Sequence, residues 1–312
     1  MTISITPMRD GWPIRHMAIL PDQKGMEEKG DDDSFPSLLF LNGRGDYLEK
    51  YAETLEDFAA LGWQAESFDW RGQGGSGRFV PNQPLLGHAT DFALWLDDLA
   101  EFSADWRGRT AAPHVMMGHS MGGHLLLRAL AERRVQADAA ILIAPMLGLV
   151  ANGVPHRIGR RIAGAMCALG LSQRQIWPDR RNIAALEEVV RERLTHSEDR
   201  FASEQLCRFR RPEVAIDAPS WGWLKAAYDS IDALARPGLL EALDIPILIL
   251  GTRADKLVLP SAIEQAALRL PQAQVHFYGA EAAHEILREA DGVRNDALAR
   301  IEAFLAQTVQ SQ

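Results

Sequence analysis

The clearest chemical signal in the sequence is a serine flanked by glycines, at residues 118–123 (GHSMGG). An apolar run precedes it at 114–117, and a segment with helical spacing follows, so we expect Ser120 on a tight turn between a strand and a helix. Glycines at both flanks leave room for a strained backbone. Free N–H groups at the helix start favour negative charge nearby. This context predicts that Ser120 is a nucleophile.

A serine hydroxyl needs a base to react at neutral pH, and nine histidines are candidates. His276 lies within an expected strand at 274–278, where it should pack against a neighbour. His284 follows that strand at the start of the last expected helix, and we expect it to be the base. Its protonation should then slow the reaction below about pH 6 to 7. His119 is expected to point away from the nucleophile as a supporting residue.

The acid of such a set should follow the preceding strand, which we expect at 245–250. Asp255 occupies that loop, where its carboxylate can accept a hydrogen bond from His284 and fix the imidazole tautomer. Glu281 and Glu285 are close to His284 in sequence and stay as alternatives. They could equally be solvated charges at a helix start.

Acyl transfer also requires two N–H donors placed for the oxyanion. The residue after the nucleophile, Met121, should supply one. The other should come from the turn in residues 41–51 (LNGRGDYLEKY), where two glycines permit a close approach. We expect Arg44 to supply this main-chain donor, with Gly43 as the alternative.

The second glycine-rich stretch, residues 68–78 (FDWRGQGGSGR), lacks the Lys-Ser/Thr ending of a phosphate loop. We interpret it as a loop bordering the site, with Asp69 and Arg71 as structural anchors. The segment HEIL at 284–287 is followed by Arg288, not by the histidine that a zinc motif requires. No cofactor and no metal are therefore expected.

Short apolar runs alternate with longer segments of helical spacing, which predicts an α/β fold with a mostly parallel, doubly wound sheet. Residues 13–20 could add an antiparallel strand or two at the edge. The expected strands cover 37–41, 64–70, 114–117, 139–144, 245–250 and 274–278, and the expected helices 46–61, 88–106, 120–133, 261–270 and 285–309.

This alternation of strand and helix patterns stops between the strands at 139–144 and 245–250. Long structureless loops are uncommon in compact domains, so we expect an inserted helical lid at 145–237, dividing a core made of 1–144 and 238–312. The lid carries 13 Arg and 1 Lys against 11 acidic residues, a net charge of about +3, whereas the rest of the chain carries about −12.

The 312 residues have ordinary globular proportions, with 47% hydrophobic and 24% charged residues. A net charge of −9 argues against a nucleic-acid partner. Two cysteines, Cys167 and Cys207, form neither a disulfide framework nor a zinc motif. The N-terminus lacks the pattern of a secretory signal, and a cytoplasmic protein is expected. A binding module would also have this composition.

Taken together, these motifs resemble the α/β-hydrolase family, in particular the branch of bacterial lysophospholipases and monoglyceride lipases grouped with serine aminopeptidases. The resemblance runs from about residue 12 to 308. It implies that Ser120, Asp255 and His284 are nucleophile, acid and base, and that Arg44 and Met121 are the oxyanion donors. The matching motifs are LNGRGDYLEKY, FDWRGQGGSGR, GHSMGG, LTHSEDRF, GTRADKLV and AAHEILRE.

The resemblance implies hydrolysis of single-chain lipid esters, either lysophospholipids or monoacylglycerols. One departure is Asn42, where related lipases often have a histidine. Apolar lid residues could line an acyl channel: Met146, Leu147, Leu149, Ile162, Met166, Leu169 and Trp177. Lid arginines could meet a phosphate or bring the protein to an anionic membrane surface: Arg157, Arg160, Arg161, Arg208, Arg210 and Arg211.

Other functions stay open. A small-ester esterase or a serine aminopeptidase would use the same three residues, and an aminopeptidase would need carboxylates to hold a free amine. Lid candidates for that role are Glu204, Glu213 and Asp217. A non-catalytic ligand-binding protein on this fold is a further alternative, which the complete set of nucleophile, acid and base argues against.

Overall fold

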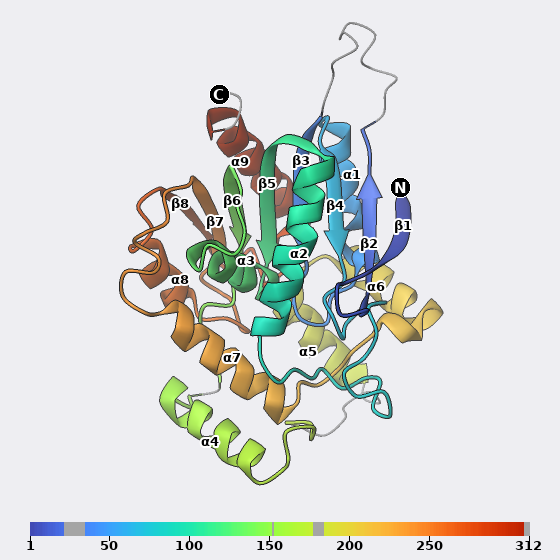
Figure 1. Ribbon diagram of the computed structural model, residues 1–312, viewed down its shortest axis with the longest axis vertical. Helices are drawn as coiled ribbons and strands as arrows, with labels where there is room; N and C mark the ends of the chain where they lie inside the picture. Colours follow the sequence, from blue (N-terminus) through green and yellow to red (C-terminus); the bar gives the residue numbers. More distant parts are fainter. Residues whose placement is uncertain (22–34, 152, 177–183, 309–312) are drawn as a thin grey trace, which may run out of the picture.

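The computed structural model describes residues 1–21, 35–151, 153–176 and 184–308. Its centre is an eight-stranded sheet in the order β1-β2-β4-β3-β5-β6-β7-β8 (Figure 1). β2 runs antiparallel to its neighbours β1 and β4, and the other adjacent pairs are parallel. The strands are β1 (Thr2–Pro7), β2 (Pro13–Ile19), β3 (Pro36–Leu41), β4 (Gln64–Phe68), β5 (Ala111–His119), β6 (Ala139–Ile143), β7 (Ile247–Thr252) and β8 (Ala273–Tyr278).

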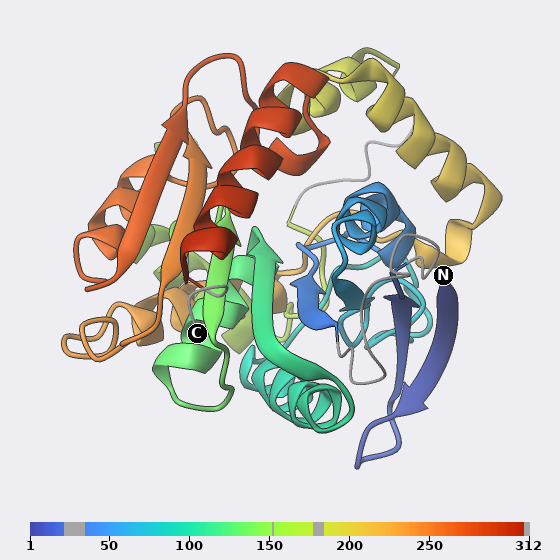
Figure 2. The ribbon, with the colours of Figure 1, turned by 90° about the horizontal axis from the view of Figure 1, so that it is seen from above.

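Helices cover both faces of this sheet. α1 (Ala52–Ala60) and α9 (Asp291–Thr308) lie on one side, and α2 (Ala93–Arg109), α3 (Met121–Ala131) and α8 (Pro260–Ala267) pack on the other (Figure 2). Every residue of β6 and β7 is buried, as expected for central strands covered on both faces. The predicted α/β class, the doubly wound sheet and the antiparallel edge are confirmed.

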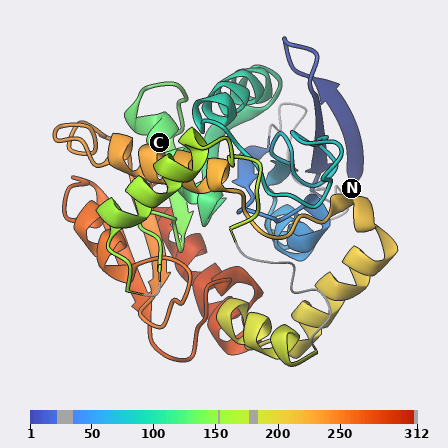
Figure 3. The same cartoon turned by 90° about the horizontal axis from the view of Figure 1, so that it is seen from below.

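Between β6 and β7, the regular structure of the described residues is helical. It comprises α4 (His156–Ala168), α5 (Ala184–Leu194), α6 (Glu198–Arg210), the 3-10 turn η3 (Pro212–Val214) and α7 (Trp221–Leu234). We call residues 145–237 the helical insertion. It lies at the end of the molecule to which the carboxyl ends of the parallel strands point (Figure 1). Seen from that end, α4 lies in front of α7 and forms the outermost layer (Figure 3).

Three predicted helices differ from the structure. The helix expected at 46–61 is divided into the 3-10 turn η2 (Leu48–Tyr51) and α1. The helix expected from residue 88 begins at Ala93, because the segment before it binds the insertion, with His88 Nδ1 2.8 Å from Ser220 Oγ. The helix expected from residue 285 begins at Asp291, after the 3-10 turn η4 (Ile286–Arg288). His284 therefore lies in a loop and does not open a helix. Among the described residues, no helix has the length and hydropathy needed to span a bilayer.

Candidate active site

Ser120 occupies a strained turn between β5 and α3. Its backbone has φ 53° and ψ −116°, a conformation that residues with a side chain rarely adopt. The flanking glycines make this turn possible, because a Cβ on Gly118 would lie 2.7 Å from the backbone of Gly122. A Cβ on Gly122 would lie 2.2 Å from the carbonyl oxygen of Leu41 on β3. The predicted turn is therefore present, and it presents the hydroxyl at the carboxyl edge of the sheet.

The structure brings Ser120, His284 and Asp255 into one hydrogen-bonded series. His284 Nε2 lies 2.9 Å from Ser120 Oγ, and His284 Nδ1 lies 2.7 Å from Asp255 Oδ2. Asp255 follows β7 and His284 follows β8, so the neighbouring parallel strands deliver both side chains to the edge that carries the serine. The other oxygen of Asp255 accepts the N–H groups of Leu257 and Val258 at 2.8 and 2.9 Å, which fixes the carboxylate.

The electrostatics of this series suit a general base. Burial alone would raise the pKa of Asp255, but the facing His284 and two backbone N–H donors outweigh it and hold the pKa below its usual value. Burial alone would lower the pKa of His284. The charge and hydrogen bond of Asp255, helped by Glu285 and Asp46, outweigh burial and raise that pKa above its ordinary value. The imidazole is thus prepared to accept a proton beside a fixed carboxylate.

The turn after β3 passes directly beside the nucleophile. A Cβ on Gly43 would lie 3.2 Å from Ser120 Cβ. The Gly43 N–H donates to Asp46 Oδ2 at 2.9 Å and is therefore occupied. Within the described residues, the N–H groups of Arg44 and Met121 have no hydrogen-bond acceptor. This difference favours Arg44 over Gly43 as the second oxyanion donor. Both oxyanion assignments stay predictions.

His119 supports the site more directly than expected. Its ring lies against that of His284, with centroids 4.9 Å apart, so it does not point away from the site. Its Nδ1 lies 2.8 Å from the Tyr51 hydroxyl and 3.3 Å from Asp46 Oδ2, and its Nε2 lies 3.4 Å from the His284 carbonyl. His276, by contrast, lies on β8 against the Tyr278 ring, as expected for a packing residue.

Behind these loops lies a group of buried charges that sequence reasoning missed. Lys50 Nζ lies 2.7 Å from Asp46, 2.6 Å from Glu285 and 3.2 Å from Glu204, and Arg288 lies 3.0 and 3.1 Å from the two glutamates. We call these five residues the buried charge cluster. It joins the turn after β3, the loop after His284 and helix α6. Glu285 is therefore neither the acid of the series nor a solvated charge. The only local signals were the spacings of Asp46 with Lys50 and of Glu285 with Arg288.

The glycine-rich loop at 68–78 is anchored as expected. Asp69 lies 2.7 Å from Arg15 and accepts the N–H of Gly75. Arg71 pairs with Asp98 at 2.6 Å. Among the described residues, no group of His, Cys, Asp or Glu is arranged to hold a metal ion.

The apolar lid candidates divide into two sets. Met146 is buried, with its N–H bound to the Ser120 carbonyl, and Leu149 pairs with Val258 in the loop of Asp255. Ile162 and Leu169 instead face solvent, 44% and 73% exposed. Trp177 lies outside the described residues.

Comparisons with known proteins agree with this architecture. The family model described as "Serine aminopeptidase, S33" matches residues 33–291. A probable lysophospholipase L2 of Haemophilus influenzae is 27% identical over 272 residues, covering 86% of this chain and 83% of that protein. Lysophospholipase L2 of Escherichia coli is 28% identical over 289 residues, covering 86% and 79%.

The solved structures show a likeness of fold. A soluble variant of monoglyceride lipase from Saccharomyces cerevisiae aligns with a TM-score of 0.76 at 17% identity, covering 99% of this chain and 97% of that one. The monoacylglycerol lipase of Paleococcus ferrophilus aligns with a TM-score of 0.69 at 16% identity, covering 94% and 98%.

Proposed function

The chain belongs to the serine aminopeptidase S33 family of α/β-hydrolases, and we propose that it hydrolyses carboxylic esters of single-chain lipids through an acyl-enzyme on Ser120. The hydrogen-bonded series of Ser120, His284 and Asp255 carries the proposal, because it contains an activated hydroxyl, a base and a carboxylate that orients the base. The two bacterial lysophospholipases, related along most of the chain, support lysophospholipids as the substrate class. The monoglyceride lipases of similar fold keep monoacylglycerols as the other candidate.

In the reaction, Ser120 Oγ attacks the ester carbonyl while His284 Nε2 takes the hydroxyl proton. The main-chain N–H groups of Arg44 and Met121 bind the oxygen that becomes negative. The tetrahedral intermediate collapses, and the alcohol leaves with the proton held by His284. Water then attacks the acyl-enzyme with His284 again as base, releasing the fatty acid and restoring Ser120. Asp255 stabilises the imidazolium formed in both steps.

The described residues offer little to a peptide amine. The three carboxylates that could hold a free amine are each paired with an internal cation. Glu204 lies 3.2 Å from Lys50, Glu213 lies 3.1 Å from Arg211, and Asp217 lies 2.8 Å from Arg208. These pairings favour an ester substrate over aminopeptidase activity.

We assign the helical insertion the role of a lid over the nucleophile, dividing a core of 1–144 and 238–312. Two contacts support this role. The end of α5 binds the loop that contains His284, because the Leu194 carbonyl accepts the N–H of Glu285 at 2.8 Å. The insertion also begins beside the nucleophile, where Met146 is a candidate for contact with an acyl chain, as is Leu149.

Helix α4 supplies the surface for peripheral membrane contact. Gly159 and Ala163 are buried on its inner side, and a Cβ on Gly159 would lie 2.4 Å from the Tyr228 hydroxyl of α7. Its outer side exposes apolar side chains beside two exposed arginines, as in helices that lie in a bilayer interface. We call this set the α4 surface: Val154, Arg157, Ile158, Arg161, Ile162 and Leu169. Arg160, Arg208 and Arg211 are instead held in ion pairs within the protein.

A matched substrate panel tests the proposed function. Purified wild type and Ser120→Ala should be compared on lysophosphatidylcholine, lysophosphatidylglycerol, monoacylglycerol, short p-nitrophenyl esters and aminoacyl-nitroanilides. The proposal expects the wild type to prefer the long single-chain lipids, with turnover lost in the variant. Activity confined to short esters would overturn the lipid assignment, and cleavage of the anilides alone would overturn the ester assignment.

A further inference from the structure

The proposed oxyanion role of Arg44 uses only its main-chain N–H and leaves its guanidinium without an assigned function. The side chain extends from the turn beside Ser120 to the helical insertion, where Nη1 donates to the Asp217 carbonyl at 2.8 Å. Its Cζ lies 5.5 Å from the centre of the Trp223 ring. Gly87 borders the group, because a Cβ there would lie 3.0 Å from Nη1. A cation is thus held between the oxyanion turn and the insertion.

Most donors of this guanidinium have no acceptor among the residues that the structure describes. A guanidinium has five N–H donors. Arg78, which is also partly buried, directs its donors at five carbonyl oxygens, those of Gly74, Gly77, Pro84, Glu213 and Ala215. Arg44 makes one such bond to the described part of the chain. No carboxylate in the described part of the chain lies within ion-pair distance of it. Arg78 is therefore a structural clamp, whereas Arg44 keeps donors for a ligand.

The nearest acidic groups already have other cations. Asp46 is bound by Lys50 at 2.7 Å, and Asp217 is bound by Arg208 at 2.8 Å. Both carboxylates favour the charge of Arg44 electrostatically, but neither forms an ion pair with it. Burial lowers the pKa of Arg44 to about 10, so the group stays cationic at neutral pH although desolvation disfavours its charge. An anion that binds there would relieve this cost.

We propose that the Arg44 guanidinium binds the phosphodiester of a lysophospholipid, which makes lysophospholipids, not monoacylglycerols, the substrates of Ser120. The proposal rests on the function proposed above. A planar guanidinium matches two phosphate oxygens, and such charge-assisted pairs are strong. In a lysophospholipid only the glycerol backbone separates the scissile ester from the phosphate. A cation whose side chain starts at the oxyanion turn is therefore suitably placed. Monoacylglycerol offers hydroxyl groups in place of this charge.

The test compares Arg44→Gln and Arg44→Lys with the wild type on lysophosphatidylcholine and a monoacylglycerol of the same acyl chain. Both variants keep the main-chain N–H. Arg44→Gln should lower kcat/KM for the lysophospholipid about 10- to 100-fold more than it lowers kcat/KM for the monoacylglycerol, chiefly through KM. Arg44→Lys should have a kcat/KM for the lysophospholipid between those of the wild type and Arg44→Gln, because lysine keeps the charge and loses the paired donors. Arg236→Gln removes an equal charge from an exposed position and should change neither value.

Equal losses on both lipids would overturn the proposal, since Arg44 would then act by shaping the turn. No loss on either lipid would also overturn it. A second readout does not depend on lipid turnover. Glycerophosphocholine should inhibit hydrolysis of a short p-nitrophenyl ester competitively, and Arg44→Gln should weaken that inhibition at least 10-fold. Inhibition by inorganic phosphate alone would indicate a free-anion site and contradict the headgroup assignment. Inhibition by glycerophosphocholine without lipid turnover would reject the proposed function while keeping the phosphodiester site.

Discussion

At the scale of single residues, the site depends on backbone positions that tolerate no side chain. Ser120 keeps its strained conformation because α3 packs against β3 at Gly122, where a Cβ would lie 2.2 Å from the Leu41 carbonyl oxygen. The atom it would meet is backbone, so no side-chain rotation relieves the contact. The placement of the nucleophile therefore depends on the packing of two elements that are far apart in the sequence.

Gly122→Ala should accordingly destabilise the protein by about 1–3 kcal/mol or more and abolish ester hydrolysis. The matched control is Gly164→Ala in α4, where a Cβ would meet nothing within 4 Å. That change should leave activity intact and stabilise the protein by about 0.5–1 kcal/mol, because alanine favours a helix. Urea unfolding and p-nitrophenyl ester turnover measure both effects. A stable, active Gly122→Ala would contradict the role assigned to this contact.

The pH dependence of kcat/KM follows from the charge state of His284. The base must be neutral, and its pKa is raised above 6.5 mainly by Asp255. Activity should therefore fall as the pH decreases, with a midpoint above 6.5. In Asp255→Asn, burial is no longer outweighed, so the midpoint should move to lower pH and the rate should fall by orders of magnitude. A pH–rate profile with an activated ester measures both, and an unmoved midpoint would argue against the pairing.

At the scale of elements, the buried charge cluster joins three parts of the chain that carry the site. Lys50 lies 4% exposed between three carboxylates. Its removal takes the cation from Asp46 and leaves Arg288 as the one cation of the cluster against three buried carboxylates. Lys50→Met should therefore destabilise the protein by about 3–5 kcal/mol. It should also slow turnover, because Asp46 accepts the Gly43 N–H and so orients the turn after β3, which carries the proposed donor Arg44.

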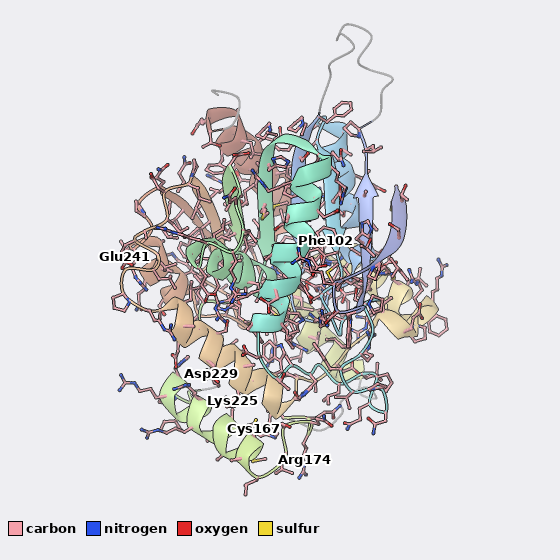
Figure 4. All side chains as sticks on the ribbon, viewed as in Figure 1. Phe102, Cys167, Arg174, Lys225, Asp229 and Glu241 are labelled. Carbon is pink, nitrogen blue, oxygen red and sulfur yellow. The ribbon has the colours of Figure 1, made fainter. Side chains whose placement is uncertain are left out.

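A matched control for this substitution lies on α7. Lys225 pairs with Asp229 at 2.6 Å near the boundary with α4, and its side chain is 42% exposed (Figure 4). Solvent screens such a pair, so Lys225→Met should change stability by about 0–1 kcal/mol. Chemical denaturation of both variants provides the comparison. Equal losses in the free energy of unfolding would contradict the idea that Lys50 matters more than Lys225 because it is buried.

The success of sequence reasoning at this scale differs between local and long-range features. β6 and β7 could be predicted because each is a continuous apolar run, and the turn at Ser120 because its glycines are adjacent in sequence. His284 and Asp255 could be predicted as partners of Ser120 because each follows a predicted strand, in the order serine, acid, histidine along the chain. The cluster could not be found, because Lys50 and Glu285 are 235 residues apart. The segment before Ala93 was wrongly predicted to be helical. The contact with the insertion that keeps it out of the helix joins residues far apart in the sequence, so no local pattern indicates it.

At the scale of the whole molecule, the α4 surface is the outermost layer at the end that carries the site (Figure 3). A lipid substrate is held in a membrane or micelle, so contact at this end would bring the nucleophile to it. In the proposed contact, the exposed apolar groups would be buried in the interface, and Arg157 and Arg161 would attract anionic headgroups.

The double variant Ile158→Ser, Leu169→Ser should lose sedimentation with vesicles of phosphatidylglycerol and phosphatidylcholine by about 10-fold. Its turnover of a soluble short ester should stay unchanged. Leu268→Ser is the control, because Leu268 is 89% exposed at the end of α8, outside the insertion. Equal sedimentation of all three proteins would reject α4 as the membrane contact.

A fluorophosphonate probe bonds to an activated serine, so it tests most directly whether Ser120 is the nucleophile of a serine hydrolase. Mass spectrometry of the digested protein locates the adduct. We expect a single adduct on Ser120 in the wild type, none in Ser120→Ala, and much slower labelling in Asp255→Asn. An unlabelled wild type, or an adduct on another residue that persists in Ser120→Ala, would contradict this role of Ser120.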